Sequence, residues 1–210
     1  MTKMSIDAIS SSPRQRRSPE AARENILNAA QILLVEQGPQ TLKLVEVARA
    51  AGISNATVLH YFGTVAELQT ALMTKMIEKL VADIIEISAR TEDHGQMAGE
   101  STAALFDAFE ARGVARLAAW LELTGESRRL TLLREAVRTV IATRADQPSG
   151  APPEILEDFI LTNISIALGV GLFGATLSML LDKPQTRARD LALALLQGRI
   201  TETMAGLGRE

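Results

Sequence analysis

The chain contains no cysteine, few aromatic residues and only two histidines, and each shortage narrows what it can be. Without cysteine it has neither a disulfide nor a thiolate metal site, which fits a reducing cytoplasm. Aromatic residues make up 3% of the 210 residues whereas alanine and leucine are abundant, which favours helix over sheet. The first residues lack the apolar core of a signal peptide, so secretion is not expected. Composition therefore predicts an all-α, cytoplasmic protein.

Motifs for catalysis are also lacking. His60 and His94, the two histidines, are not placed to form a metal cluster, and no serine stands in a nucleophile elbow or P-loop. Residues 169–174 match G-x-G-x-x-G, but they lie inside an apolar run of helix length with no strand before it. A dinucleotide site requires that strand. We therefore predict no catalytic residues, no metal and no cofactor, and a protein that is not an enzyme.

Charge is divided unevenly along the chain. The net charge is −3, but residues 1–65 carry seven Lys/Arg against five Asp/Glu, whereas residues 66–210 carry fifteen against twenty. A mildly basic segment joined to an acidic one is expected to bind nucleic acid through one face and to repel it elsewhere.

The basic segment contains the strongest local signals. Ser18, Pro19 and Glu20 are an N-cap, a first-turn proline and a first-turn acid, which predict a helix that ends at Gly38. Residues 1–18 before it, with Arg14, Arg16 and Arg17, are predicted to be a disordered basic tail.

Two short helices follow around a glycine turn. The apolar face of the first includes Val47 and Ala48, with Thr41 as its expected N-cap, and Gly52 ends it. Ser54 is placed to cap the second helix, roughly residues 55–62. This is the helix-turn-helix pattern, in which the second helix enters the DNA major groove.

A longer helix then begins near Ala66. Residues 64–67, Thr-Val-Ala-Glu, form a capping box that starts it. Apolar residues at about every fourth position continue to residue 90, so this helix connects the helix-turn-helix to the rest of the chain.

The N-terminal pattern resembles that of TetR-family transcriptional regulators. The matching residues are Ala29, Ala30, Leu33, Gly38, Thr41, Val47, Ala48, Ala51, Gly52, Ile53, Ser54, Thr57, Val58, His60, Tyr61, Phe62, Gly63, Glu67 and Leu68. The resemblance implies an all-helical homodimer that binds a palindromic double-stranded DNA operator, with a small-molecule effector in the second domain. It predicts a helix-turn-helix domain at residues 19–65 and an effector-binding and dimerisation domain at residues 66–210.

The second short helix supplies most of the predicted DNA contacts. We expect Thr57, His60 and Tyr61 to contact the backbone or base edges, and Asn55 and Ala56 to approach from the helix N-terminus. The flank is expected to be anchored by Thr41 and Lys43. The chain departs from the family at two positions. Leu59 stands where a tyrosine is common, and Val65 stands where a lysine is common.

The second domain gives weaker signals. We predict a loop at residues 91–100 and helices at 100–112, 114–124 and 127–145, followed by a proline-rich break. An effector pocket is expected to be mainly apolar. Its candidates, each of which also fits a place in the core, are Phe106, Phe109, Trp120, Asn163 and Phe173.

Residues 159–181 are 23 consecutive residues without a formal charge. Length and apolarity also suit a membrane span, but Thr162, Asn163 and Ser165 interrupt the run, and it lacks the flank of positive charges that orients a membrane helix. We predict a central helix packed on several sides, with no membrane partner. Its small residues and the stripe on the last helix predict a two-fold dimer interface, or alternatively a monomer core. The interface candidates are Ala167, Gly171, Ala175, Leu191 and Leu195.

The sequence therefore predicts a ligand-responsive repressor that binds its operator as a homodimer and is released by a small molecule. The alternatives are a helical carrier or enzyme for small molecules, and a membrane-anchored protein that uses residues 159–181.

Overall fold

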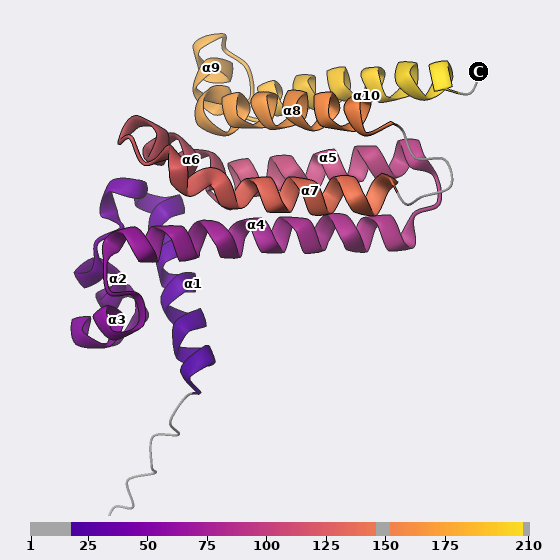
Figure 1. Ribbon diagram of the computed structural model, residues 1–210. Helices are drawn as coiled ribbons and strands as arrows, with labels where there is room; N and C mark the ends of the chain where they lie inside the picture. The colour runs from indigo at the N-terminus through magenta and orange to yellow at the C-terminus, as the bar shows by residue number, and fades with distance from the viewer. Residues whose placement is uncertain (1–17, 146–151, 208–210) are drawn as a thin grey trace, which may run out of the picture.

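The structure is a computed structural model that describes residues 18–145 and 152–207. These residues form helices and their connections, which confirms the predicted all-α class (Figure 1). Residues 1–17, including Arg14, Arg16 and Arg17 of the predicted tail, lie outside the described residues.

Three helices form the N-terminal unit, which we call the reader (residues 19–65). They are α1 (Pro19–Gln37), α2 (Leu44–Ala51) and α3 (Asn55–Phe62), with a short turn of 3-10 helix at Pro39–Thr41. Ile26 and Leu27 of α1, Val47 of α2, and Val58 of α3 are buried in one cluster. The cluster continues into α4 (Val65–Arg90) through Leu68 and Leu72, so the reader and the long helix share a core.

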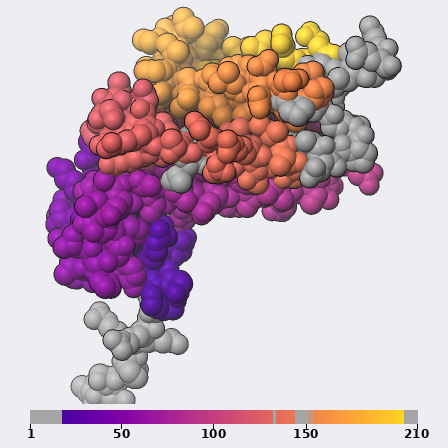
Figure 2. Space-filling view, in the orientation of Figure 1, coloured from indigo at the N-terminus to yellow at the C-terminus, as the bar shows by residue number. Residues whose placement is uncertain are grey.

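The remaining helices form the body (residues 66–210). α5 (His94–Glu110) and α7 (Leu132–Ala145) pack on α4, and α8 (Pro153–Gly169) and α10 (Arg187–Leu207) pack on α5 from the other side (Figure 1). α6 (Val114–Leu123) leads from α5 back over the reader, and α9 (Ala175–Leu180) continues α8 after a π-helical turn at Val170–Gly174. The body is thus three layers of helices, with α4 as the layer that reaches the reader. Figure 2 shows the reader projecting below one end of these layers.

Two local predictions were wrong. Thr41 does not cap α2, because Lys43 takes the N-cap position and Thr41 donates its hydroxyl to the Gly38 carbonyl at 2.7 Å. The predicted loop at residues 91–100 is also mostly helix. Asp93 caps α5 by accepting from the Gln96 N–H at 2.6 Å, and this cap lets a segment with two glycines start a helix.

The apolar run at residues 159–181 is helical but is not enclosed. Glu154–Leu180 is long and apolar enough to span a membrane, with a mean hydropathy of 1.8, and 17% of its most apolar stretch is buried. The prediction of a helix packed on several sides therefore fails for the single chain. One side contacts α5, α7 and α10, and the other is open.

Candidate functional site

The turn between α2 and α3 fixes the angle at which α3 projects. Gly52 has φ +67° and ψ +34°, a left-handed conformation that glycine adopts without a Cβ penalty. Ile53 N–H donates to the Ala48 carbonyl at 3.0 Å, and Asn25 of α1 donates its side-chain amide to the Ala51 carbonyl at 3.0 Å. The turn is therefore held both by α2 itself and by α1.

α3 is anchored along one side and open along the other. Ser54 accepts the Thr57 N–H at 3.1 Å, while Val58 and Phe62 are buried against the reader core. The opposite side carries Asn55, Ala56, Leu59 and His60, all of them exposed. A helix held by its apolar side, with Asn55 and His60 among its outward side chains, is suited to a groove that offers hydrogen-bonding groups.

Three of the other four DNA-contact candidates are in less open positions. Thr57 and Tyr61 are half-buried, and the Thr57 hydroxyl lies 2.8 Å from the Ser54 hydroxyl. The His60 and Tyr61 rings meet edge to face, with their centroids 5.6 Å apart. Thr41 is half-buried, whereas Lys43 is exposed at the start of α2, where a cation and open N–H groups together favour an anion.

Two residues beside this face had no assigned role. Leu59 projects from the middle of α3 with half of its surface exposed, and an apolar side chain of this kind can contact a thymine methyl. The Arg23 guanidinium of α1 lies 5.3 Å from the centre of the Phe62 ring, so it brings an exposed positive charge next to α3. Leu59 could have been singled out from the sequence, because it is a large apolar residue on the side of this helix that was predicted to face outward.

The chain enters α4 through a tight corner. Thr64 accepts the Glu67 N–H at 3.1 Å while Glu67 accepts the Thr64 N–H at 2.9 Å, so the predicted capping box is present. Gly63 alone separates α3 from this box, and Leu68 and Leu72 of α4 lie in the same buried cluster as Val58 of α3, so α3 and α4 are packed together.

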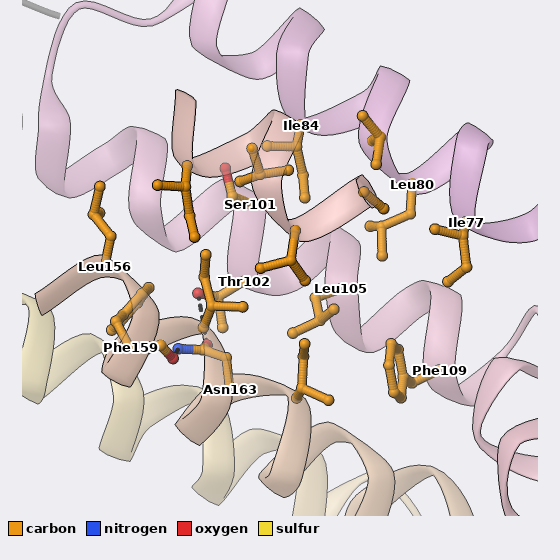
Figure 3. A pocket seen from close by; sticks show the side chains of 17 residues that line it. Ile77, Leu80, Ile84, Ser101, Thr102, Leu105, Phe109, Leu156, Phe159 and Asn163 are labelled. Carbon is orange, nitrogen blue, oxygen red and sulfur yellow. Dashed lines mark hydrogen bonds between the residues drawn. The ribbon is translucent and has the colours of Figure 1, made fainter. Parts of the chain in front are cut away.

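A second feature lies in the body, between four helices. A cavity of about 100 Å³ is lined by α4, α5, α7 and α8 (Figure 3). Its walls are mostly apolar, and the exceptions are Ser101, Thr102 and Asn163. Ile77, Leu80 and Ile84 of α4 form one wall, so the cavity contacts the same helix that leaves the reader.

The five predicted pocket residues are divided between this cavity and other places. Phe109 and Asn163 line it. Phe106 is buried in the core, Trp120 is half-buried on α6, and Phe173 is 59% exposed on the π-helical turn, so these three lie outside its wall. The sequence could not separate the two groups, because an aromatic on a helix shows no sign of which neighbour it faces.

Of the five predicted interface residues, three are open to solvent at least in part and two lie against their own chain. Leu191 and Leu195 are 53% and 61% exposed on α10, and Ala175 is half-buried. Ala167 is buried inside the chain, and a Cβ on Gly171 would lie 2.9 Å from the Ala115 Cβ. Ala167 is therefore enclosed by its own chain, and Gly171 lets the π-helical turn approach α5 and α6, whereas the place of both residues in a subunit interface stays a prediction.

The corner between α5 and α6 connects the body to the reader. Gln31 of α1 donates to the Arg112 carbonyl at 3.2 Å, and Arg116 donates to the Val35 carbonyl. The Arg112 guanidinium donates to Asp83 of α4 at 2.9 Å. Arg112 thus contacts α1 through its backbone and α4 through its side chain, a junction that sequence reasoning missed because its members are far apart in the chain.

The Asp83 carboxylate makes this junction sensitive to acid. Partial burial raises the pKa of Asp83, but hydrogen bonds from Lys79 and Arg112 outweigh it and hold the pKa below the ordinary value of 3.8. A depressed carboxyl pKa stabilises the fold above the ordinary pKa, and this stabilisation is lost as pH falls through the folded-state value.

Asp83→Asn is therefore expected to lower the free energy of unfolding at neutral pH by about 1 kcal/mol and to flatten its decline below pH ~4. Denaturant unfolding measured from pH 3 to pH 7 tests this, with Glu135→Gln as the control. Glu135 pairs with Arg138 in an open position where the two side chains are 72% and 66% exposed, so its loss should change little. Equal losses for both variants would contradict the role of Asp83.

Within residues 18–145 and 152–207, no three His, Asp or Glu side chains lie close enough together to hold a metal ion. The chemistry that the described residues offer is therefore that of two surfaces: an exposed helix face in the reader and an apolar cavity in the body.

Comparison with known proteins places both features in one architecture. Residues 26–72 match the model of a family described as bacterial regulatory proteins, tetR family. An uncharacterized HTH-type transcriptional regulator of Mycobacterium tuberculosis (strain CDC 1551 / Oshkosh) is 33% identical over 81 residues, which are 35% of this chain and 40% of the relative. This chain thus spans less than half of the length of that relative.

Solved structures resemble the chain over most of its length. A transcriptional regulator from Rhodococcus sp. Rha1 aligns with a TM-score of 0.64 at 22% identity, over 86% of this chain and 96% of that one. The multidrug binding protein EbrR, crystallised with imidazole, aligns with a TM-score of 0.57 at 20% identity, over 83% and 93%. At these identities the likeness establishes the fold.

Proposed function

The chain belongs to the tetR family of bacterial regulatory proteins, and from this premise we propose that it is a homodimeric, ligand-responsive repressor of the cytoplasm. It binds a palindromic operator through two copies of α3 and is released by a small molecule. The observation that carries the proposal is the outward face of α3, held in place by buried Val58 and Phe62.

The proposed DNA contacts follow the exposure of this face. Asn55, Ala56 and His60 meet base edges or phosphates directly, because they are exposed. Thr57 and Tyr61, which are half-buried, position the helix and reach the backbone at its edge. Lys43, at the start of α2, contributes a phosphate contact from the flank, where Thr41 shapes the turn before it.

The proposed dimer explains the open side of the apolar helix. Large apolar side chains gather on the open surfaces of α8, α9 and α10, and a soluble chain rarely leaves such a patch uncovered. The exposed members are Leu161, Phe173, Leu177, Leu180, Leu181, Leu191 and Leu195. A second copy related by a two-fold axis covers this patch with its own and separates the two readers by a fixed distance.

Release follows from the position of the cavity. Its wall includes Ile77, Leu80 and Ile84 of α4, the helix that begins directly after α3. A ligand that widens the cavity tilts α4 and changes the separation of the two α3 helices. A coupling free energy of about 1–3 kcal/mol is enough for useful regulation.

Selection of bound sequences from random duplexes tests the proposal. Recovery of an inverted repeat supports a dimeric reader, and recovery of no preferred sequence contradicts it. That duplex then becomes the probe for effectors, which are expected to weaken its binding.

His60→Ala is expected to weaken binding to the selected duplex by at least roughly thirtyfold, because a base contact contributes about 1–3 kcal/mol and a dimer loses two of them. Titration by fluorescence anisotropy measures this. Arg134→Ala is the control: it removes an exposed positive charge from α7, in the body, and should leave the affinity unchanged. An unchanged affinity for His60→Ala would remove this residue from the contact face.

A further inference from the structure

The lining of the cavity contains no charged side chain among the described residues. Fourteen of the seventeen lining residues are aliphatic or aromatic, and the others are Ser101, Thr102 and Asn163. An ion transferred to such a site loses its hydration and finds no opposite charge, which costs several kcal/mol of binding free energy. The lining therefore selects against carboxylates and ammonium groups alike.

The polar residues are concentrated at one place. Thr102 of α5 donates its hydroxyl to Asn163 Oδ1 of α8 at 3.1 Å, and the two side chains face each other across the cavity wall (Figure 3). Thr102 is 5% exposed and Asn163 is 3% exposed, so water does not readily replace this pair. Ser101 points its hydroxyl back to the Met97 carbonyl of its own helix at 2.8 Å.

This pair retains hydrogen-bonding capacity. Asn163 donates one amide hydrogen to the Phe159 carbonyl at 2.7 Å, and its amide carries a second. The Thr102 oxygen, which donates its hydrogen to Asn163, still has lone pairs that accept. The hydroxyl of an alcohol can therefore meet a donor and an acceptor at this one place, whereas a ketone oxygen can meet only the donor.

The shape follows the helices. The lining extends from Ile77 to Ile84 on α4 and from Leu156 to Ile164 on α8. At 1.5 Å per residue these stretches are about 10–12 Å long. The cavity volume of about 100 Å³ is below the ~300–1,000 Å³ of typical ligand sites, so a chain-like ligand must widen it.

We infer that the effector is an uncharged, elongated, mainly aliphatic molecule with one hydrogen-bonding oxygen, which Thr102 and Asn163 recognise. This inference rests on the proposed function, since it names the ligand class of the cavity that the regulator uses. The length of the aliphatic part widens the space between α4 and α8, and the oxygen fixes which end of the molecule lies beside Asn163.

A matched series of probes tests the ligand class with the full-length protein and without DNA. Octanol, octane, octanoate and octylamine share one chain length and differ in the end group. We expect octanol to bind tightest by calorimetry and to raise the Tm most, octane to bind roughly fivefold weaker, and both ions at least roughly a hundredfold weaker.

Variants then locate the recognition. Asn163→Leu removes the amide while keeping a similar volume, and it is expected to abolish the preference for octanol over octane. Thr102→Val, which keeps the side-chain shape, should reduce the same preference and provides the test should Asn163→Leu fold poorly. Val140→Phe fills the cavity from α7 and should weaken octanol and octane together.

Three results would overturn the inference: an ion that binds tightest, no binding by any probe, or a preference for octanol that survives both Asn163→Leu and Thr102→Val. The duplex selection is independent of these measurements. If an inverted repeat is recovered but an ion binds tightest, the inferred ligand class is wrong and the proposed regulatory function stands. Octanol binding without any selected duplex overturns the regulator instead.

Discussion

Replacing Leu195 with glutamate is expected to convert the protein from a dimer to a monomer and to reduce operator affinity at least roughly a hundredfold. Leu195 is 61% exposed on α10 and is one of the large apolar side chains that are open on α8, α9 and α10. A two-fold interface contains each residue twice, so one substitution introduces two carboxylates. Burying them without partners costs several kcal/mol, which is comparable to the whole contribution of a few interface anchors.

The loss of DNA binding follows from the loss of the dimer. A monomer presents one α3 to a duplex and gains only half of the contacts, and it no longer holds a second reader at the spacing of an inverted repeat. Folding should be spared, because in the single chain the Leu195 side chain already faces solvent. The helical circular dichroism of the variant is therefore expected to match that of the parent protein.

Ile32→Glu is the matched control for Leu195→Glu. Ile32 is 56% exposed on α1, so it is as open as Leu195 but lies outside the patch. Sedimentation velocity should show a monomer for Leu195→Glu and a dimer for Ile32→Glu. A Leu195→Glu protein that sediments as a dimer would place the subunit contact elsewhere.

The same patch accounts for the hydropathy of residues 154–180. These residues suit a membrane span by length and composition. One side of the helix nevertheless packs on α5, α7 and α10 and carries buried Asn163, which is hydrogen-bonded to Thr102. A second copy of the chain, as proposed, would cover the apolar side that remains, so no bilayer is needed to account for it.

The sequence predicted the reader well because its signals are local. The Ser18 cap, the left-handed turn at Gly52, the Ser54 cap and the capping box of Thr64 and Glu67 each involve residues at most four apart, and all are present. The N-cap of α2 was wrongly assigned to Thr41, because a threonine before an apolar helical pattern can also lie in a turn. Here its hydroxyl donates to the Gly38 carbonyl. The all-α class followed from composition and periodicity in the same way.

The body was harder to predict, because the residues that line a pocket or an interface depend on which way each helix faces. Residues 159–181 are apolar all round, so periodicity cannot separate the side that packs inside the chain from the open side. Ala167 and Gly171 were therefore assigned to the subunit interface without any sign that Ala167 is buried in its own chain and that Gly171 approaches α5 and α6. The cavity lining could not be predicted from the sequence either, because Ile77 and Asn163 become neighbours only when the helices assemble.

Gly171→Ala is expected to destabilise the protein, although alanine is the better helix former. A Cβ at this position would lie 2.9 Å from the Ala115 Cβ and 3.0 Å from the Phe109 carbonyl oxygen. Both atoms are fixed by helix backbones, so the π-helical turn must move away from α5 and α6. Overpacking of this kind costs about 1–3 kcal/mol, against a gain of up to about 1 kcal/mol in helix propensity.

Displacement of the π-helical turn is expected to affect the reader as well as the packing of the core. Ala115 lies on α6 between Arg112 and Arg116, whose hydrogen bonds hold α1 through Gln31 and Val35. Moving α6 loosens these contacts, so operator affinity is expected to fall in Gly171→Ala even though residue 171 is far from α3 along the chain. Anisotropy titration with the selected duplex measures this second effect beside the loss of stability.

A double-mutant cycle with Ala115→Gly separates the steric contact from other causes. Ala115→Gly alone should cost about 1 kcal/mol, because glycine weakens a helix. In the double variant the nearest clashing atom is gone, so we expect its free energy of unfolding to exceed the additive value by about 1 kcal/mol. Denaturant unfolding of the four proteins gives this coupling directly. Strict additivity would show that the Ala115 Cβ does not limit how closely the turn approaches α6, and it would leave the Phe109 carbonyl oxygen as the atom that limits the approach.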